Sequence, residues 1–230
     1  MMPAGPVELL DYDVQPGTAG ASGPSGGLVL LHGLGEDKSA LQPLGARLCP
    51  AGSVAVYPSL RGHGKSPKPA WGYSPWDCAA DLQRIADTLP SRLHLVGFSY
   101  GALVALATAI ALGPRRVRSL VVLDQSFEAR PAKAFAGGGG EVFRAELTYL
   151  KWGFDHRHLL FMAAGAGIPM LTVLASHSHV VPPGERGRML ASAGQRQMVR
   201  VLDTDHRGLV SDVPRLAALL EDFYLRTDLC

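Results

Sequence analysis

The chain has 230 residues, of which 47% are hydrophobic and 18% are charged. This length fits one domain, and the composition is that of a globular protein with enough aliphatic side chains for a large core. The formal net charge is +2, from 22 basic and 20 acidic side chains. Such a balance gives no support to nucleic acid or an anionic membrane surface as a partner. We therefore expect a single domain over residues 1–230.

The cysteines give a first indication of the compartment. Cys49, Cys78 and Cys230 are an odd set without CxxC spacing, which argues against a disulfide framework and is typical of reduced thiols in a cytoplasmic protein. The first residues, MMPAGPVELLDYDV, contain neither the basic region nor the apolar stretch of a signal peptide. No apolar run free of breakers reaches about 18 residues, so we expect a cytoplasmic protein without a membrane span.

Short apolar runs alternate with segments of helical periodicity along the chain. The predicted strands lie at 7–14, 28–32, 53–57, 93–97, 117–123, 170–175 and 198–202. The predicted helices lie at 40–48, 74–89, 99–112, 183–193 and 213–225. Ser74 before Pro75 is typical of a helix start, because a polar cap precedes an early proline. This alternation predicts an α/β fold, a mostly parallel sheet flanked by helices, with reactive groups at the carboxyl ends of the strands.

The stretch 126–166 interrupts this alternation, because it contains no predicted strand. It holds a glycine run at 137–140, a segment of helical spacing at 141–150 and several aromatic side chains, Trp152 among them. Long unstructured loops are uncommon in compact domains. We therefore expect a small helical lid over the strand ends, and the alternative is an ordinary crossover with a disordered tip.

The strongest chemical signal is the sequence LHLVGFSYG at 93–101, a predicted strand followed by a tight turn and a helix. In this context the G-x-S-x-G pattern, Gly97 to Gly101, indicates that Ser99 is a nucleophile. A sharp turn strains the serine backbone and leaves no room for side chains two positions away. The serine would lie at a helix N-terminus, which favours an anion. The alternative is a packing turn whose serine only caps the helix.

A second glycine-rich turn, in the sequence LVLLHGLGED, follows the predicted strand 28–32. Acyl transfer requires backbone N–H groups that face the developing oxyanion. We expect one of them to be the N–H of Leu34 and the other to be the N–H of Tyr100, which follows the serine. A plain glycine-rich strand exit is the alternative, because such loops are common.

The motifs HGLG, RGHGKS, GFSYG and a C-terminal DH occur in this order along the chain. From about residue 7 to its end, the chain thereby resembles the α/β-hydrolase superfamily. The resemblance implies that fold and a general base after the last strand, where LDTDHRG supplies His206. It says little about the substrate, since one fold carries many reactions. His94 lies inside a strand, where we expect it half-buried or exposed. His177 and His179 form an HxH pair without a carboxylate cluster, so we expect no metal site.

The acid departs from the family pattern. It most often follows the strand that corresponds to 170–175, where this chain has LASHSHVVP, with Ser178 in the place of the aspartate. The best substitute is Asp124, one strand earlier, where some family members resemble this chain and where the order serine, acid, histidine is kept. A triad is defined by geometry rather than by sequence position. The alternatives are a dyad assisted by Ser178 or water, an acid at Asp203 or Asp205, and a purely structural Asp124 that caps the lid.

These residues predict a serine hydrolase that cleaves a carboxylic ester or thioester through an acyl-enzyme and needs no cofactor. The substrate would be a small molecule, free or carrier-bound, and the Ala, Gly, Arg and Pro content fits biosynthetic metabolism in a GC-rich bacterium. The alternatives are a non-hydrolytic family member, such as a cyclase or a C–C bond-cleaving enzyme, and an inactive binding protein. The residues expected to line an apolar substrate pocket, each with ordinary core packing as the alternative, are Trp71, Trp76, Phe127, Trp152, Phe161 and Val180.

Overall fold

The computed structural model describes residues 7, 9–129, 153–194 and 197–228. Seven strands of the described chain form one sheet in the order β1-β3-β2-β4-β5-β6-β7, and only the β1–β3 pair is antiparallel. The strands are β1 Tyr12–Pro16, β2 Gly27–Leu31, β3 Val54–Pro58, β4 Leu93–Phe98, β5 Val117–Leu123, β6 Met170–Ala175 and β7 Gln197–Leu202. The helices are α1 Gln42–Leu48, α2 Pro75–Ala86, α3 Tyr100–Leu112, α5 Arg157–Gly165, α6 Pro183–Ala191, α7 Gly208–Ser211 and α8 Val213–Asp228.

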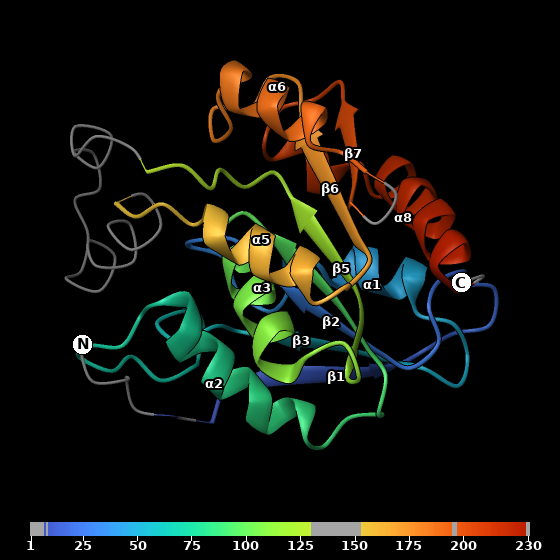
Figure 1. Cartoon of the computed structure of the whole chain (residues 1–230). Helices are drawn as coiled ribbons and strands as arrows, with labels where there is room; N and C mark the ends of the chain where they lie inside the picture. The colour runs from blue at the N-terminus through green and yellow to red at the C-terminus, as the bar shows by residue number, and fades with distance from the viewer. Residues whose placement is uncertain (1–6, 8, 130–152, 195–196, 229–230) are drawn as a thin grey trace.

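Helices cover both faces of the sheet (Figure 1). On one face lie α2, α3 and α5, where Leu82 and Leu103 join strand side chains in one apolar core. On the other face lie α1 and α8, where Leu44 and Leu220 belong to a second core. Because both faces are covered, β2 is buried along its whole length, and a strand of this kind is visible in a sequence as a solid apolar run.

The predicted fold class is confirmed, and the bounds of β5 and β6 are as expected. The first strand is the clearest error in position, because it was expected over 7–14 and begins at Tyr12. Its pairing with β3 begins at Tyr12 opposite Pro58, and Leu10 contributes to the core instead, with 4% of its surface exposed. The short helix α7 was not predicted.

The prediction for His94 was wrong. Its side chain is buried, because β4 is a central strand with helices over both faces. The ring Nδ1 lies 2.7 Å from the Ser119 hydroxyl on β5, and the ring meets Tyr224 of α8 edge-on at 5.6 Å. A polar side chain in a fully covered strand is thus satisfied by its neighbours rather than by water.

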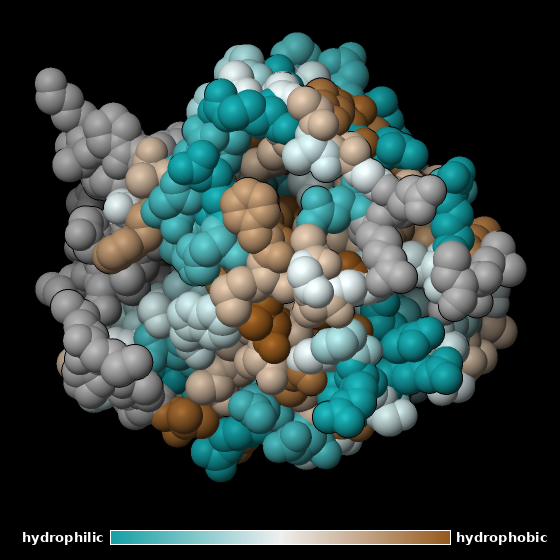
Figure 2. All heavy atoms as spheres, viewed as in Figure 1, coloured by the Kyte–Doolittle hydropathy of each residue, from teal (hydrophilic) through white to brown (hydrophobic). Residues whose placement is uncertain are grey.

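Most of the expected lid, residues 130–152, lies outside the described residues. The helix α5 belongs to the same stretch, and its Leu159 and Ala163 pack into the core with α3. Its outer side exposes Phe161 and Met162, and apolar side chains are visible in this part of the surface in Figure 2. Within the described ranges, no helix combines the length and the apolarity needed to span a bilayer.

Candidate active site

Ser99 occupies the turn between β4 and α3. Its backbone has φ 53° and ψ −122°, a conformation that L-residues rarely adopt, and its N–H donates to the Leu123 carbonyl at 2.8 Å. A Cβ at Gly97 would lie 2.3 Å from the Gly101 carbonyl oxygen, and a Cβ at Gly101 would lie 2.3 Å from the Leu31 carbonyl oxygen. Both positions therefore require glycine, for the steric reason that the sequence motif suggests.

Two backbone amides near this turn can serve a ligand. In the described part of the chain, neither Leu34 N–H nor Tyr100 N–H donates to an acceptor of the protein. Tyr100 begins α3, where an N–H has no intrahelical partner, and its phenol is directed elsewhere, donating to the Tyr73 carbonyl at 2.7 Å. The loop that carries Leu34 touches the serine turn, since a Cβ at Gly101 would lie 2.5 Å from the His32 carbonyl oxygen. Unpaired donors in this place are what an oxyanion requires.

A buried imidazole holds the loop of Leu34 in shape. His32 Nδ1 lies 2.8 Å from the Gly33 carbonyl oxygen, and the Leu60 N–H donates to His32 Nε2 at 3.0 Å. These partners require a neutral ring, with the proton on Nδ1. Burial lowers the pKa of His32 to about 4, in agreement with that requirement. The Gly33 N–H donates to the Glu36 carboxylate at 2.8 Å and closes the turn.

Asp124 and His206 meet at the carboxyl ends of β5 and β7. Asp124 Oδ2 lies 2.7 Å from His206 Nδ1, and the carboxylate is fully buried while His206 is 8% exposed. Asp124 has a φ of 45°, and its N–H donates to the Val173 carbonyl of β6 at 2.8 Å. Because an ionised carboxylate only accepts hydrogen bonds, this contact assigns a ring proton to Nδ1, so that the tautomer of the neutral ring is the one with the lone pair on Nε2.

The His206 ring lies beside the serine turn. It stacks on Phe98, with ring centroids 4.6 Å apart, and Phe98 directly precedes Ser99 in the chain. His179 meets the same ring edge-on at 5.1 Å, whereas His177 lies 3.0 Å from the Asp203 carboxylate. The two histidines of the HxH pair thus have different neighbours. Among the described residues, no three His, Cys, Asp or Glu side chains are grouped to hold a metal ion.

Sequence reasoning missed a carboxylate that anchors the segment after Asp124. Glu185, in the first turn of α6, is buried, and its two oxygens accept from the Ser126 hydroxyl and the Phe127 N–H, each at 2.6 Å. No local pattern could reveal this contact, because 58 residues or more separate the partners and an acidic residue early in a helix is common.

The expected pocket residues fall in different parts of the structure. Phe127 and Phe161 line the same cavity of about 240 Å³ between α5 and α6. Val180 packs with Leu174 of β6 and with Val181 in a small cluster at the end of that strand. Trp152 lies outside the described residues. Trp71 and Trp76 lie at the surface, with 46% and 41% of their area exposed, and Phe161 is 74% exposed although it lines the cavity.

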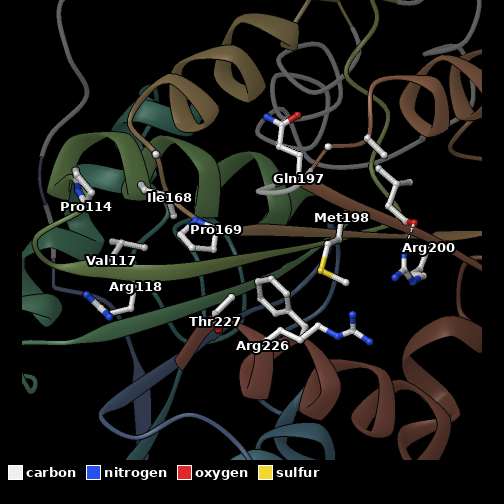
Figure 3. Close-up of a pocket in the computed structure, with 15 residues that line it drawn as sticks. Pro114, Val117, Arg118, Ile168, Pro169, Gln197, Met198, Arg200, Arg226 and Thr227 are labelled. Atoms are coloured by element: carbon white, nitrogen blue, oxygen red, sulfur yellow. Dashed lines mark hydrogen bonds between the residues drawn. The ribbon is translucent and has the colours of Figure 1, made fainter. Parts of the chain in front are cut away.

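A wide groove of about 1030 Å³ opens at the other end of the sheet. It lies at the start of β5 and β7 and against the end of α8, and Arg118, Arg200 and Arg226 stand around it (Figure 3). The reactive groups of the sequence motifs follow the carboxyl ends of the strands. This groove at the amino ends is therefore separate from them.

Comparisons with known proteins agree with the observed fold. The profile of the alpha/beta hydrolase family matches residues 28–224. RutD of Variovorax paradoxus (strain S110), a carbamate hydrolase by name, is 30% identical over 218 residues, or 87% of this chain and 76% of RutD. A pimeloyl-(acyl-carrier protein) methyl ester esterase of Pseudoalteromonas atlantica (strain T6c) is 32% identical over 128 residues, which cover 54% of this chain and 46% of the esterase.

The solved structures extend the agreement in fold to most of the chain. Bromoperoxidase from Bacillus anthracis superposes with a TM-score of 0.74 at 18% identity, over 92% of this chain and 94% of the bromoperoxidase. At this identity the likeness concerns the fold alone. The family profile, by contrast, spans the serine turn and both ends of the Asp124–His206 contact. The chain therefore belongs to the alpha/beta hydrolase family, and it is a hydrolase.

Proposed function

We propose that this hydrolase cleaves small carboxylic esters or thioesters, with Ser99 as nucleophile, His206 as general base and Asp124 as the acid that orients the base. The observation that carries the proposal is the buried 2.7 Å contact of Asp124 with His206 Nδ1, on a ring that stacks against the neighbour of Ser99. A carboxylate bound to Nδ1 sets the tautomer in which Nε2 can accept a proton.

In the first step, Ser99 Oγ attacks the carbonyl carbon of the substrate, and its proton passes to His206 Nε2. The Leu34 and Tyr100 amides donate to the oxyanion of the tetrahedral intermediate. Asp124 stabilises the imidazolium through the Nδ1–H hydrogen bond. When the intermediate collapses, His206 gives its proton to the leaving alcohol or thiol and the acyl group stays on Ser99.

In the second step, water attacks the acyl-enzyme while His206 Nε2 accepts the proton of the water. The same two amides stabilise the second oxyanion, and the proton returns to Ser99 Oγ as the carboxylic acid leaves. All the proton transfers use one imidazole. This requires a ring that can gain and lose a proton near neutral pH, which is the property that distinguishes histidine among side chains.

The substrate class rests on chemistry and on the names of relatives. The Pseudoalteromonas relative is named for a methyl ester and RutD for a carbamate, and both substrates present a carbonyl to the nucleophile. The buried Phe127, three positions after Asp124 in the chain, supports a hydrophobic acyl or aromatic group. We propose a small-molecule substrate, free or carrier-bound, because a net charge of +2 gives no footprint for nucleic acid.

We also propose that the chain works as one domain in the cytoplasm. Cys49 and Cys78 are buried free thiols, while Cys230 lies outside the described residues. Unpaired cysteines are typical of a reducing compartment.

A fluorophosphonate probe distinguishes an active serine hydrolase from an inactive binding protein. We expect the probe to label the wild-type protein at Ser99, as located by mass spectrometry, because only an activated serine reacts. The Ser99→Ala variant should remain unlabelled. Ser91→Ala, which removes an exposed hydroxyl just before β4, at the opposite end of that strand from Ser99, should label like the wild type. A wild-type protein that stays unlabelled would overturn the proposal.

Turnover of matched substrates then identifies the bond. We expect hydrolysis of p-nitrophenyl esters and of the corresponding thioesters, and loss of both activities in Ser99→Ala. If only the matched p-nitrophenyl carbamate is hydrolysed, the ester and thioester assignment is wrong. Labelling of Ser99 without hydrolysis of any of the three would instead favour a non-hydrolytic member of the family.

A further inference from the structure

Ser178 shares an oxygen atom with the proposed base. Its hydroxyl donates to Asp124 Oδ2 at 2.6 Å, and His206 Nδ1 lies 2.7 Å from the same oxygen. The other oxygen, Oδ1, accepts from the Ala175 N–H at 2.9 Å. Within the described residues, the carboxylate of Asp124 therefore has three hydrogen-bond partners, of which one is a histidine ring.

The direction of the Ser178 hydrogen bond follows from its other partners. Ser178 Oγ accepts from the N–H groups of Val180 and Val181, each at 3.0 Å. A serine hydroxyl has one proton and two acceptor lone pairs. Because two backbone donors occupy the lone pairs, the proton is directed to Asp124. The backbone of 178–181 thus holds the hydroxyl in the donating orientation before any substrate binds.

We propose that Ser178 is a positioning residue that acts through Asp124 on His206. Its permanent hydrogen bond to Oδ2 fixes the plane of the carboxylate toward Nδ1 and withdraws part of the negative charge that faces the imidazole. The proposal rests on the proposed function, because it assigns Ser178 a role in the same proton transfer. It also explains how the site works with a serine after β6, since that serine supports an acid at the end of β5.

Several other groups surround His206 and bear on its proton affinity. Asp124 comes from the end of β5, His179 from the segment after β6, and Phe98, which precedes Ser99, from the end of β4. From the loop after β2, Glu36 lies 4.0 Å from Arg207, the neighbour of the base. The Ser178 hydroxyl is distinct from these groups, because it acts on His206 only through the oxygen of Asp124 that the two residues share.

The consequence has a definite sign. Without the Ser178 hydroxyl, Asp124 Oδ2 carries more uncompensated negative charge toward the ring, so the imidazolium becomes more stable. We expect Ser178→Ala to move the acidic limb of the kcat/KM profile to higher pH by about half a unit. We also expect kcat/KM at its pH optimum to fall about tenfold, because a hydrogen bond to a charged group is lost.

Three further variants distinguish a positioning role of the Ser178 hydroxyl from a general disturbance of the loop that carries it. Ser178→Thr keeps the hydroxyl and should recover most of kcat/KM and the wild-type pH profile. Ser176→Ala, two residues away, removes an exposed hydroxyl that donates to Asp203, and should leave both unchanged. In an Asp124→Asn background, Ser178→Ala should cost much less than it does alone, because the two residues act as a unit.

A measurement without turnover completes the test. In Ser99→Ala protein, the NMR titration of the His206 ring should move to higher pH when Ser178→Ala is added. An unchanged titration midpoint together with an unchanged kcat/KM profile would overturn the inference. It would also be overturned if Ser178→Ala lowered kcat/KM by the same factor in the wild-type and in the Asp124→Asn background. Full activity in Ser99→Ala would instead refute the proposed function, so the two failures are distinguishable.

Discussion

Two buried carboxylates of this protein, Asp81 and Asp124, each meet one basic side chain. Asp81 on α2 accepts from Arg61 at 2.7 Å and 2.6 Å, and the side chains of both are fully buried. Asp124 meets His206 at 2.7 Å, and the His206 side chain is 10% exposed. Arginine keeps its proton at any pH at which the protein folds, whereas histidine exchanges its proton near neutrality. The first pair is permanently ionised, and the second can move a proton.

The buried ion pair of Arg61 and Asp81 has a structural role. Arg61 also donates to the Gly72 carbonyl at 2.6 Å, so the pair with Asp81 fixes the RGHGKS turn against α2. Breaking such a pair leaves a buried charge without a partner. A buried carboxylate therefore does not by itself indicate catalysis. The proposal for Asp124 rests instead on a histidine as its partner, on a ring that lies against the serine turn and reaches solvent.

Asp124→Asn is expected to have the largest effect on activity. The amide donates where the carboxylate accepted, so His206 adopts the tautomer that has no lone pair on Nε2. We expect kcat to fall roughly 10⁴-fold, as in a serine protease triad with the same change, while the melting temperature changes little. Asp203→Asn, which alters an exposed carboxylate bound to His177, is the matched control. A loss below about tenfold would exclude Asp124 from the mechanism.

Asp81→Ala is expected to have the opposite profile. It leaves the Arg61 guanidinium buried without its carboxylate, so the free energy of unfolding should fall by about 3–5 kcal/mol in chemical denaturation. The folded fraction should keep its kcat. Joint replacement by Arg61→Met and Asp81→Leu should regain most of the stability, since two apolar side chains bury no charge. A stable Asp81→Ala protein with low kcat would contradict the division between the two pairs.

Local sequence patterns were sufficient to predict the fold and the positions of the candidate site residues along the strand ends. The apolar runs at 117–123 and 170–175 match β5 and β6, because strands covered on both faces need apolar side chains throughout. The serine turn was recognisable because two backbone approaches of 2.3 Å admit only glycine. Parallel strands bring their carboxyl ends to one edge, so Asp124 and His206 could be placed near one another. Their catalytic roles stay predictions.

The supporting contacts could not be predicted, because they join distant segments through common residue types. The sequence offered Ser178 only in the place of the usual aspartate or as the helper of a dyad without an acid, yet its hydroxyl binds Asp124, 54 positions earlier in the chain. Glu185 binds Ser126 across 59 positions. The burial of His94 was missed for a related reason, since its partner Ser119 lies on a neighbouring strand. Periodicity indicates which face a side chain occupies, but it does not identify the partner on that face.

His32 extends the comparison to a buried imidazole whose ring nitrogens meet backbone groups. Its folded-state pKa of about 4 lies below the unfolded value of 6.5, so between these pH values the unfolded chain binds a proton that the folded chain does not. Stability therefore falls as the pH drops from about 6.5 to about 4, by about 3 kcal/mol in total. In His32→Gln this part of the pH dependence should be absent from denaturation curves, whatever the stability at pH 7. Parallel pH profiles for the two proteins would contradict the neutral, structural assignment of His32.

Ser74 tests the smallest expected effect on the helix that carries Asp81. The sequence predicts a helix start at this residue, and the structure has a capping box there. The Ser74 N–H donates to Asp77 Oδ2 at 3.0 Å, and the Asp77 N–H donates to Ser74 Oγ at 3.2 Å. Ser74→Ala should lower the free energy of unfolding by about 1 kcal/mol, and Ser74→Gly by only a few tenths, with kcat unchanged in both. If Ser74→Ala cost as much as Asp81→Ala, the cap of α2 would matter as much as its buried ion pair, and the permanent charge pair would lose its special structural role.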